Sequence, residues 1–239
     1  MSVPDFRLHG PEDGRPVILS NALGPTSAVW DAQLPALAAR YQVLTYEPAP
    51  RATVEALAED VLELATTAGL DRFSFCGLSL GAMVGMRLAL SAPERIDRLV
   101  LACTSARFGA PAEWKARASL VGACGMQAVA ADALEKWFTP GFEDRARFLE
   151  MQLAASPDDY ALGLEAIGRF DARDEIASIE APTLVVAGAD DTATPPADGG
   201  YLARRIPDAD LVVLPGAAHL ANVERADAFN AVLLAHLAR

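Results

Sequence analysis

The segment FSFCGLSLGAMVG, from Phe73 to Gly85, decides the fold. Residues 73–76 are apolar or small and predict a short buried strand, and residues 80–90 have the spacing of a helix. Ser79 stands at the junction, between two glycines. A G-x-S-x-G turn from strand to helix is typical of a nucleophile elbow, where glycines remove side chains that would clash in the tight turn. The segment therefore predicts a serine nucleophile at the carboxyl end of a strand.

Strands and helices alternate on both sides of this segment. We expect strands over 16–20, 41–46, 73–76, 99–103, 183–187 and 210–214, and helices over 27–40, 54–68, 80–90 and 224–237. Thr53 is expected to cap the helix over 54–68, and Gly69 stands where that helix should stop. The alternation predicts the α/β class, with a mostly parallel sheet flanked by helices on both faces.

The alternation breaks between residues 105 and 176. This stretch has no clear strand and holds helical patterns, such as 126–138 and 145–154, separated by prolines. We interpret it as a helical cap inserted into the sheet domain. The predicted division is therefore a core formed by 1–104 and 177–239 and a cap formed by 105–176.

Composition excludes several classes of partner. The chain has 239 residues, 52% of them apolar, and a formal net charge of −12, which argues against nucleic acid and anionic membranes as partners. No apolar run is long enough to span a membrane, and the first residues lack the pattern of a secretory signal. Cys76, Cys103 and Cys124 form no CxxC motif, and Cys76 and Cys103 stand in apolar strand-like runs, which predicts reduced core thiols in a cytoplasmic protein. No cluster of histidines and cysteines has the spacing of metal ligands, so we expect no structural zinc. The sequence leaves the oligomeric state open.

A serine nucleophile needs a base, and the chain has three histidines. His9 lies in a segment that resembles a peripheral hairpin, and His236 is expected at the surface of the last helix. His219 follows the strand over 210–214, at the carboxyl end of a strand, where open α/β sheets hold their sites. His219 is therefore the predicted base for Ser79.

The segment GADDTATPP, residues 188–196, follows another strand and offers Asp190 and Asp191 as the acid that orients the base. The order Ser79, Asp191, His219 is the order of the α/β-hydrolases and differs from that of other serine hydrolase folds. This order favours a Ser-His-Asp triad.

An oxyanion formed at this serine needs two N–H donors. The residue after the nucleophile, Leu80, supplies one. The second should come from the loop after the first buried strand, 21–24, and there we predict the N–H of Leu23, since Gly24 lets the chain turn sharply beside it.

With these residues in place, the sequence resembles the α/β-hydrolase family and, within it, the 3-oxoadipate enol-lactonases. The resemblance spans nearly the whole chain and is carried by LSNALG, FCGLSLGAMVG, APERIDRLVLACTSARFG, KWFTPGF, APTLVVAGADDTATPP and AAHLANVE. It implies Ser79, Asp191 and His219 as triad, Leu23 and Leu80 as backbone donors, and Trp137 of KWFTPGF at the substrate. It also implies hydrolysis of an enol-lactone through an acyl-enzyme, with no cofactor and no metal.

One departure from the family pattern concerns a pocket wall. The family usually continues after the strand that corresponds to 41–46 into a glycine-rich loop, whereas here Tyr46 is followed by Glu47-Pro-Ala-Pro-Arg51. This predicts a reshaped wall and leaves a broad carboxylesterase or lactonase as an alternative function. A non-catalytic ligand-binding scaffold is a further alternative, which the intact serine, aspartate and histidine disfavour.

The implied substrate is a small anionic lactone, and its carboxylate needs a local cation in a chain of net charge −12. The cap and its hinges carry an arginine-rich stretch, which consists of Arg107, Arg117, Arg145, Arg147, Arg169 and Arg173. Among these we predict Arg107, just after a strand end, and Arg169, beside Phe170, as the residues that bind the substrate.

Overall fold

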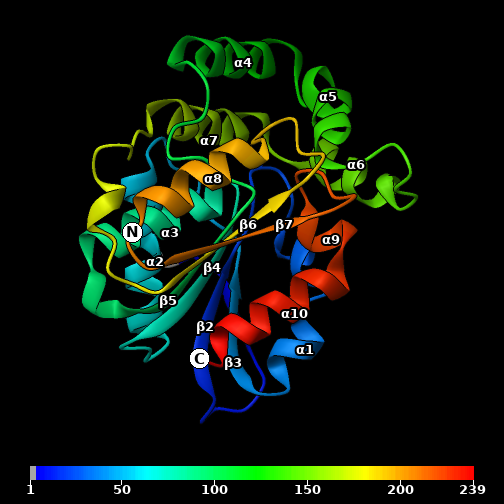
Figure 1. Ribbon diagram of the computed structural model, residues 1–239. Helices are drawn as coiled ribbons and strands as arrows, with labels where there is room; N and C mark the ends of the chain where they lie inside the picture. The colour runs from blue at the N-terminus through cyan, green and yellow to red at the C-terminus, as the bar shows by residue number, and fades with distance from the viewer. Residues whose placement is uncertain (1–3) are drawn as a thin grey trace.

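Strand β4, which leads into Ser79, occupies the centre of the sheet in the computed structural model, which describes residues 4–239 (Figure 1). The strands lie in the order β1-β3-β2-β4-β5-β6-β7. Their bounds are β1 (Phe6–His9), β2 (Arg15–Ser20), β3 (Tyr41–Tyr46), β4 (Phe73–Leu78), β5 (Ile96–Ala102), β6 (Thr183–Gly188) and β7 (Ala209–Leu214). Only β1 is antiparallel to its neighbour within the described residues, so the predicted mostly parallel α/β sheet is confirmed.

Helices cover both faces of the sheet, and each face has its own apolar core. The helices of the sheet domain are η1 (Ser27–Trp30), α1 (Leu34–Ala38), α2 (Val54–Thr67), α3 (Leu80–Ser91), η2 (Pro93–Arg95), α8 (Pro196–Arg205), α9 (Ala221–Glu224) and α10 (Ala226–Leu237). Along β5, Leu99 and Leu101 pack with α2 and α3, whereas Val100 and Ala102 pack with α10. This alternation follows from the pleat, which turns successive side chains to opposite faces.

The local signals for α2 act as predicted. The Thr53 side chain accepts a hydrogen bond from the N–H of Ala56 at 3.3 Å, and Gly69 adopts a φ of +73° just beyond the end of the helix. The single helix predicted over 27–40 is wrong, because the chain forms η1 and then α1. Pro35 has no N–H and cannot lie inside a helix, and here it takes a first-turn position of α1.

Between β5 and β6 lie α4 (Pro111–Cys124), α5 (Gln127–Trp137), α6 (Arg145–Ala154), α7 (Pro157–Arg169) and η3 (Ile176–Ser178). Figure 1 shows α4 and α5 (green) beyond one end of the sheet, at the top of the view. Pro111 and Pro157 begin helices, since proline fits the first helical position, where its missing N–H costs nothing.

The division into a core (1–104 and 177–239) and a cap (105–176) remains our proposal, and residues 1–3 of that core lie outside the described part of the chain. Within residues 4–239, no helix combines the length and the apolar character needed to cross a bilayer.

His236 corrects one expectation about the surface. Its side chain is only 4% exposed, because α10 packs it against the sheet together with Leu233 and Leu237. Burial lowers the pKa of His236, and the positive charges of Arg98 and Arg239 lower it further. The folded protein therefore holds this imidazole neutral at pH values where an unfolded chain protonates it.

The lowered pKa of His236 gives the fold a dependence on pH. An unfolded histidine titrates near 6.5, so the stability linked to neutral His236 is present above about pH 6.5 and is lost as the pH falls. Between about pH 7.5 and pH 5, the Tm of a His236→Gln variant should fall less than that of the wild type, by roughly 2 °C in a chain of this size. Thermal melts across this range test it, with His9→Gln as the matched control. Equal slopes for the wild type and His236→Gln would contradict the assignment.

Candidate active site

Ser79 occupies the sharp turn that the sequence predicts. Its backbone has φ of 55° and ψ of −112°, and its N–H donates to the carbonyl of Ala102 at 2.9 Å. A Cβ added at Gly77 would overlap the carbonyl oxygen of Gly81, and one added at Gly81 would overlap that of Ser20. The two glycines are therefore required by close backbone contacts, and the left-handed φ of Ser79 stores strain at the site.

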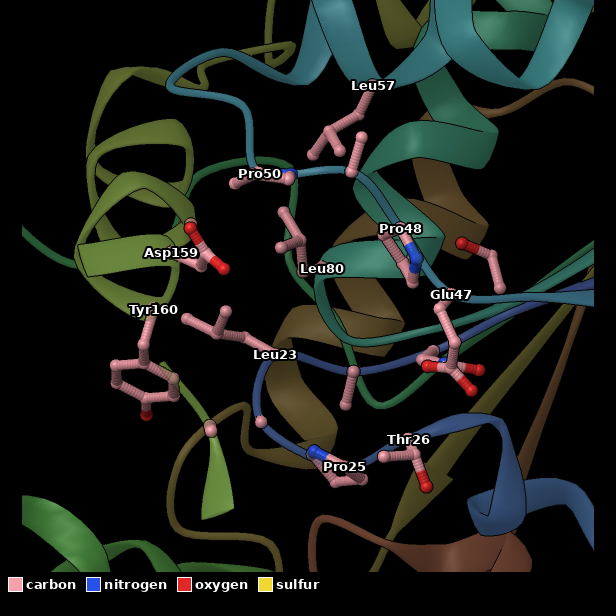
Figure 2. Close-up of a pocket in the computed structure, with 18 of the residues that line it drawn as sticks. Leu23, Pro25, Thr26, Glu47, Pro48, Pro50, Leu57, Leu80, Asp159 and Tyr160 are labelled. Carbon is pink, nitrogen blue, oxygen red and sulfur yellow. The ribbon is translucent and has the colours of Figure 1, made fainter. Parts of the chain in front are cut away.

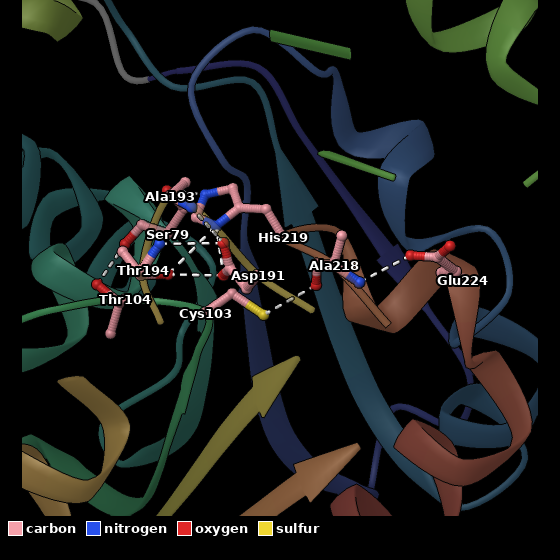
Figure 3. A network of polar contacts seen from close by, with 9 residues as sticks. All are labelled: Ser79, Cys103, Thr104, Asp191, Ala193, Thr194, Ala218, His219 and Glu224. Carbon is pink, nitrogen blue, oxygen red and sulfur yellow. Dashed lines mark hydrogen bonds and ion pairs between the residues drawn. The ribbon is translucent and has the colours of Figure 1, made fainter. Parts of the chain in front are cut away.

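Three residues that lie far apart in the sequence meet at this turn. The Nε2 of His219 lies 2.9 Å from the Oγ of Ser79, and its Nδ1 lies 2.8 Å from the Oδ2 of Asp191. Figure 3 shows these contacts as one continuous network. With the Nδ1–H donating to the carboxylate, Nε2 is the acceptor for the serine hydroxyl, which is the arrangement needed to activate a nucleophile.

Asp191 is held as a buried carboxylate. Its Oδ1 accepts the N–H groups of Ala193 and Thr194 at 2.8 and 3.0 Å, and its Oδ2 accepts the hydroxyl of Thr194 at 2.8 Å. Burial alone would raise the pKa of Asp191, but the charge of His219 and the hydrogen bonds from His219 and Thr194 outweigh it and hold the pKa below its usual value. Asp190 is exposed. The structure therefore brings Asp191, and not Asp190, to the histidine.

Cys103 is buried beside this network, and its thiol is not activated. Its Sγ lies 4.0 Å from the carbonyl oxygen of Ala218. Burial, with a smaller contribution from the charge of Asp191, raises the pKa of Cys103 to about 12. A thiol with this pKa stays protonated near neutral pH and is a poor nucleophile. Among residues 4–239, no group of three or more His, Cys, Asp or Glu side chains is arranged to hold a metal ion.

The loop that carries His219 is hydrogen-bonded to the end of α5. The N–H of His219 donates to the carbonyl of Lys136 at 3.3 Å, and the N–H of Leu220 donates to the carbonyl of Trp137 at 3.0 Å. These bonds use only backbone atoms. The position of the histidine thus depends on the helices between β5 and β6 as well as on the sheet.

Glu224 makes a second link between the same two segments. Its Oε2 accepts the N–H of Ala218 at 2.8 Å, and its Oε1 accepts the N–H of Thr139 at 2.9 Å (Figure 3 shows the bond to Ala218). One carboxylate therefore joins the residue before His219 to the residues after α5.

Ser79 and His219 line a cavity of about 330 Å³, which we call the serine cavity. Aromatic side chains form much of its wall, namely Phe108, Trp114, Trp137 and Tyr160. The charged side chains in the wall are Glu113, Arg117 and Lys136. Arg117 and Lys136 both contact Asp132, at 2.5 and 3.1 Å, which fixes two cations on one side of the cavity.

The two residues predicted as oxyanion donors lie beside Ser79. Leu80 is the first residue of α3, so its N–H has no acceptor within the helix and lies at the positive end of the helix dipole. Leu23 lines the serine cavity together with Ser79. The N–H of Gly81 donates to the carbonyl of Asn21 at 3.1 Å and ties the Leu23 loop to the start of α3.

The predicted arginines are placed elsewhere. Arg107 lies 3.9 Å from Asp171 and is 37% exposed, and Arg169 pairs with Glu165 at 2.7 Å and is 58% exposed. In the described part of the chain, neither lines the serine cavity. Arg169 lies on the exposed side of α7, and Arg107 lies in the loop before α4, close to Asp171, whereas α4 and α5 bring Arg117 and Lys136 into the cavity wall.

The cations that do line the serine cavity were not singled out from the sequence. Arg117 is one of the six arginines of the cap and its hinges, and Lys136 lies four residues after Asp132, a spacing that is also typical of a solvated pair of charges on a helix. The signal for Lys136 was its place directly before Trp137 in KWFTPGF. Trp137 itself lines the cavity.

Comparison with known proteins gives a consistent set of relatives. Residues 3–232 match the model of the alpha/beta hydrolase family. The chain is 35% identical to 3-oxoadipate enol-lactonase 2 of Acinetobacter baylyi, over 95% of this chain and 90% of that protein. It is 34% identical to a RutD protein of Stutzerimonas stutzeri, to which carbamate hydrolysis is provisionally ascribed, over 98% of this chain and 96% of that protein. The crystal structure of the enol-lactonase from Burkholderia xenovorans superposes with a TM-score of 0.95 at 35% identity, covering 98% of this chain and 96% of that one.

Proposed function

Because the chain belongs to the α/β-hydrolase family, we propose that it is a serine hydrolase whose substrate is a small anionic lactone of the 3-oxoadipate enol-lactone type. The observation that carries the proposal is the hydrogen-bonded series Ser79, His219, Asp191 at the wall of the serine cavity. The similarity to enol-lactonases over nearly the whole chain supports the choice of substrate.

In the first half of the reaction, the Oγ of Ser79 attacks the lactone carbonyl while the Nε2 of His219 takes the hydroxyl proton. The N–H groups of Leu23 and Leu80 hold the oxyanion that forms. Asp191 stays ionised and balances the imidazolium. When the ring C–O bond breaks, the enol oxygen takes the proton back from His219, and the enol stays attached because it belongs to the same molecule as the acyl group.

In the second half, water attacks the acyl-enzyme and gives a proton to His219. The ester bond to Ser79 breaks, the serine oxygen recovers that proton, and the open-chain acid leaves. One water is consumed in each turnover, and one lactone becomes one dicarboxylic product.

Arg117 and Lys136 are the residues we propose for the carboxylate of the substrate. Their positive charges lie in the wall of the cavity that holds Ser79, where the carboxylate of a bound lactone can form charge-assisted hydrogen bonds with them. Asp132 neutralises part of this charge and orients both side chains.

Replacing Arg117 or Lys136 by Gln should raise KM for the anionic lactone. The expected loss in kcat/KM is about 10- to 100-fold, since a hydrogen bond to a charged group contributes about 1.5–3 kcal/mol. On an uncharged ester of similar size the loss should nearly vanish. Steady-state kinetics with both substrates measure the difference, and Arg107→Gln is the matched control. Equal losses on both substrates would exclude recognition of the carboxylate by these residues.

The substrate preference of the wild-type protein distinguishes the alternative functions. We expect the highest kcat/KM on authentic enol-lactone, lower values on neutral esters, and the lowest on simple carbamates. A preference for neutral esters would favour a broad carboxylesterase, and a preference for carbamates would favour the activity ascribed to RutD proteins. A fluorophosphonate probe that fails to label Ser79 would point to a non-catalytic scaffold.

The cytoplasmic location stays part of the proposal, supported by the free, buried thiols of Cys76 and Cys103.

A further inference from the structure

A second and larger cavity lies next to the serine cavity. It has a volume of about 550 Å³, within the range of sites that bind small molecules, and carbon atoms form most of its wall. Leu23 and Tyr160 line both cavities and therefore form a shared wall. Figure 2 shows Leu23 and Tyr160 on one side of this second cavity and Glu47 and Pro48 on the other. The reaction proposed above leaves this space unused.

The wall opposite Leu23 is a short, rigid loop. It consists of Glu47-Pro-Ala-Pro-Arg51, the segment that replaces the usual glycine-rich loop. Two prolines restrict its backbone, and the guanidinium of Arg51 binds both carboxylate oxygens of buried Asp60 at 2.8 Å. Glu47 accepts the N–H of Ser27 at 2.9 Å. The cavity is thus preformed, which lowers the ordering cost for a ligand that enters it.

Several polar groups of the cavity wall are engaged within the protein. The hydroxyls of Ser20 and Tyr46 lie 2.7 Å apart in a hydrogen bond, and the charge of Arg51 is matched by Asp60. Glu47, Glu150 and Asp159 add negative charges to the wall. A carboxylate would lose hydration here and meet repulsion, whereas an alkyl chain would gain from the apolar surface.

The side chain of Leu23 separates the two cavities and forms a partition between them, and a glycine in α7 leaves space for this side chain. A Cβ added at Gly163 would overlap the Cδ1 of Leu23, so this glycine sets where the leucine side chain lies. Leu23 is half-buried and borders both spaces. Leu80, whose N–H we assign to the oxyanion, lines the second cavity too. The second cavity therefore begins at the residue that follows the nucleophile.

We propose that the second cavity is an acyl-chain subsite that takes the unbranched apolar acyl chain of an uncharged ester, with Leu23 turning aside to admit it. Ser79 attacks the ester carbonyl, the alcohol leaves with the proton from His219, and water releases the fatty acid. The inference rests on Ser79 as nucleophile, but not on the enol-lactone as substrate. The structure thus adds hydrolysis of neutral acyl esters to the activity proposed above.

The test compares p-nitrophenyl esters of acetate and octanoate. In the wild type, kcat/KM for octanoate should exceed that for acetate by about tenfold or more, since each methylene bound in an apolar pocket favours the longer substrate. Val84→Phe fills the cavity from α3, and Ala49→Phe fills it from the opposite loop. If one of these variants fails to fold, the other still tests the subsite. Both should abolish the preference for octanoate. Leu23→Ala should increase it, because the partition is removed.

Val213→Phe is the matched control, since Val213 is 40% exposed on β7 and lines neither cavity described here. Its ratio of octanoate to acetate activity should equal that of the wild type. An octanoate preference that survives both filling variants, or a wild type with no preference, overturns the subsite. A wild type that hydrolyses octanoate but not the enol-lactone refutes the lactonase proposal and leaves the subsite standing.

Discussion

Ser79→Ala is expected to lower kcat/KM by about 10⁵-fold or more while leaving the fold intact. The variant loses the only oxygen that lies 2.9 Å from the Nε2 of His219 in the described structure, and alanine fits the same turn. Cys103 cannot replace it, because its thiol is protonated and bonded towards the carbonyl of Ala218. The residual rate would come from the oxyanion donors and the cavity alone.

Steady-state kinetics on the lactone and on a neutral ester, with circular dichroism to confirm folding, measure this loss. Ser91→Ala is the matched control, since Ser91 is a helix-end serine whose hydroxyl bonds the carbonyl of Arg87. It should keep wild-type rates. Near wild-type activity in Ser79→Ala would show that another residue starts the reaction.

Asp191→Asn should lower kcat by about 10⁴-fold, the loss typical of the corresponding change in other Ser-His-Asp triads. The amide cannot stabilise the imidazolium, and its NH₂ group donates to Nδ1 of His219, so that Nε2 carries the proton and cannot accept that of Ser79. The bonds from Ala193 and Thr194 should still hold the loop in place.

Asp190→Asn provides the matched control for Asp191. It makes the same chemical change one residue away, at an exposed position, and should alter kcat by no more than about threefold, as surface substitutions usually do. Kinetics of the two variants side by side give the ratio. If Asp190→Asn were the damaging change, the assignment of the acid would be shifted by one residue.

The parts of the site that the sequence predicts well are those determined by local backbone geometry. Gly77 and Gly81 are needed because neighbouring carbonyls leave no space for a Cβ, so the motif itself encodes the turn. Asp191 and His219 follow strands of a parallel sheet, and the carboxyl ends of such strands meet at one edge. Knowing the strands was enough to bring the three residues together.

The parts that the sequence does not predict depend on how helices pack on one another. The rotation of α4 and α5 about their axes decides which cations face the serine cavity. The spacing of apolar residues in the sequence does not predict this rotation. His236 is a different case, since it lies three residues after Leu233 and one before Leu237, on the same buried face of α10. The helical spacing of the apolar residues predicts a buried position for His236, whereas the polar residue type predicts an exposed one, and the spacing is the better guide here.

The backbone bonds between the histidine loop and the end of α5 have a consequence for evolvability. The carbonyls of Lys136 and Trp137 hold His219 and Leu220, while the side chains of the same two residues line the serine cavity. Mutation can exchange those side chains, and with them the choice of substrate, without removing a bond that holds the base. Substrate specificity can therefore change at residues that line the cavity, while the hydrogen bonds that position the catalytic base are kept.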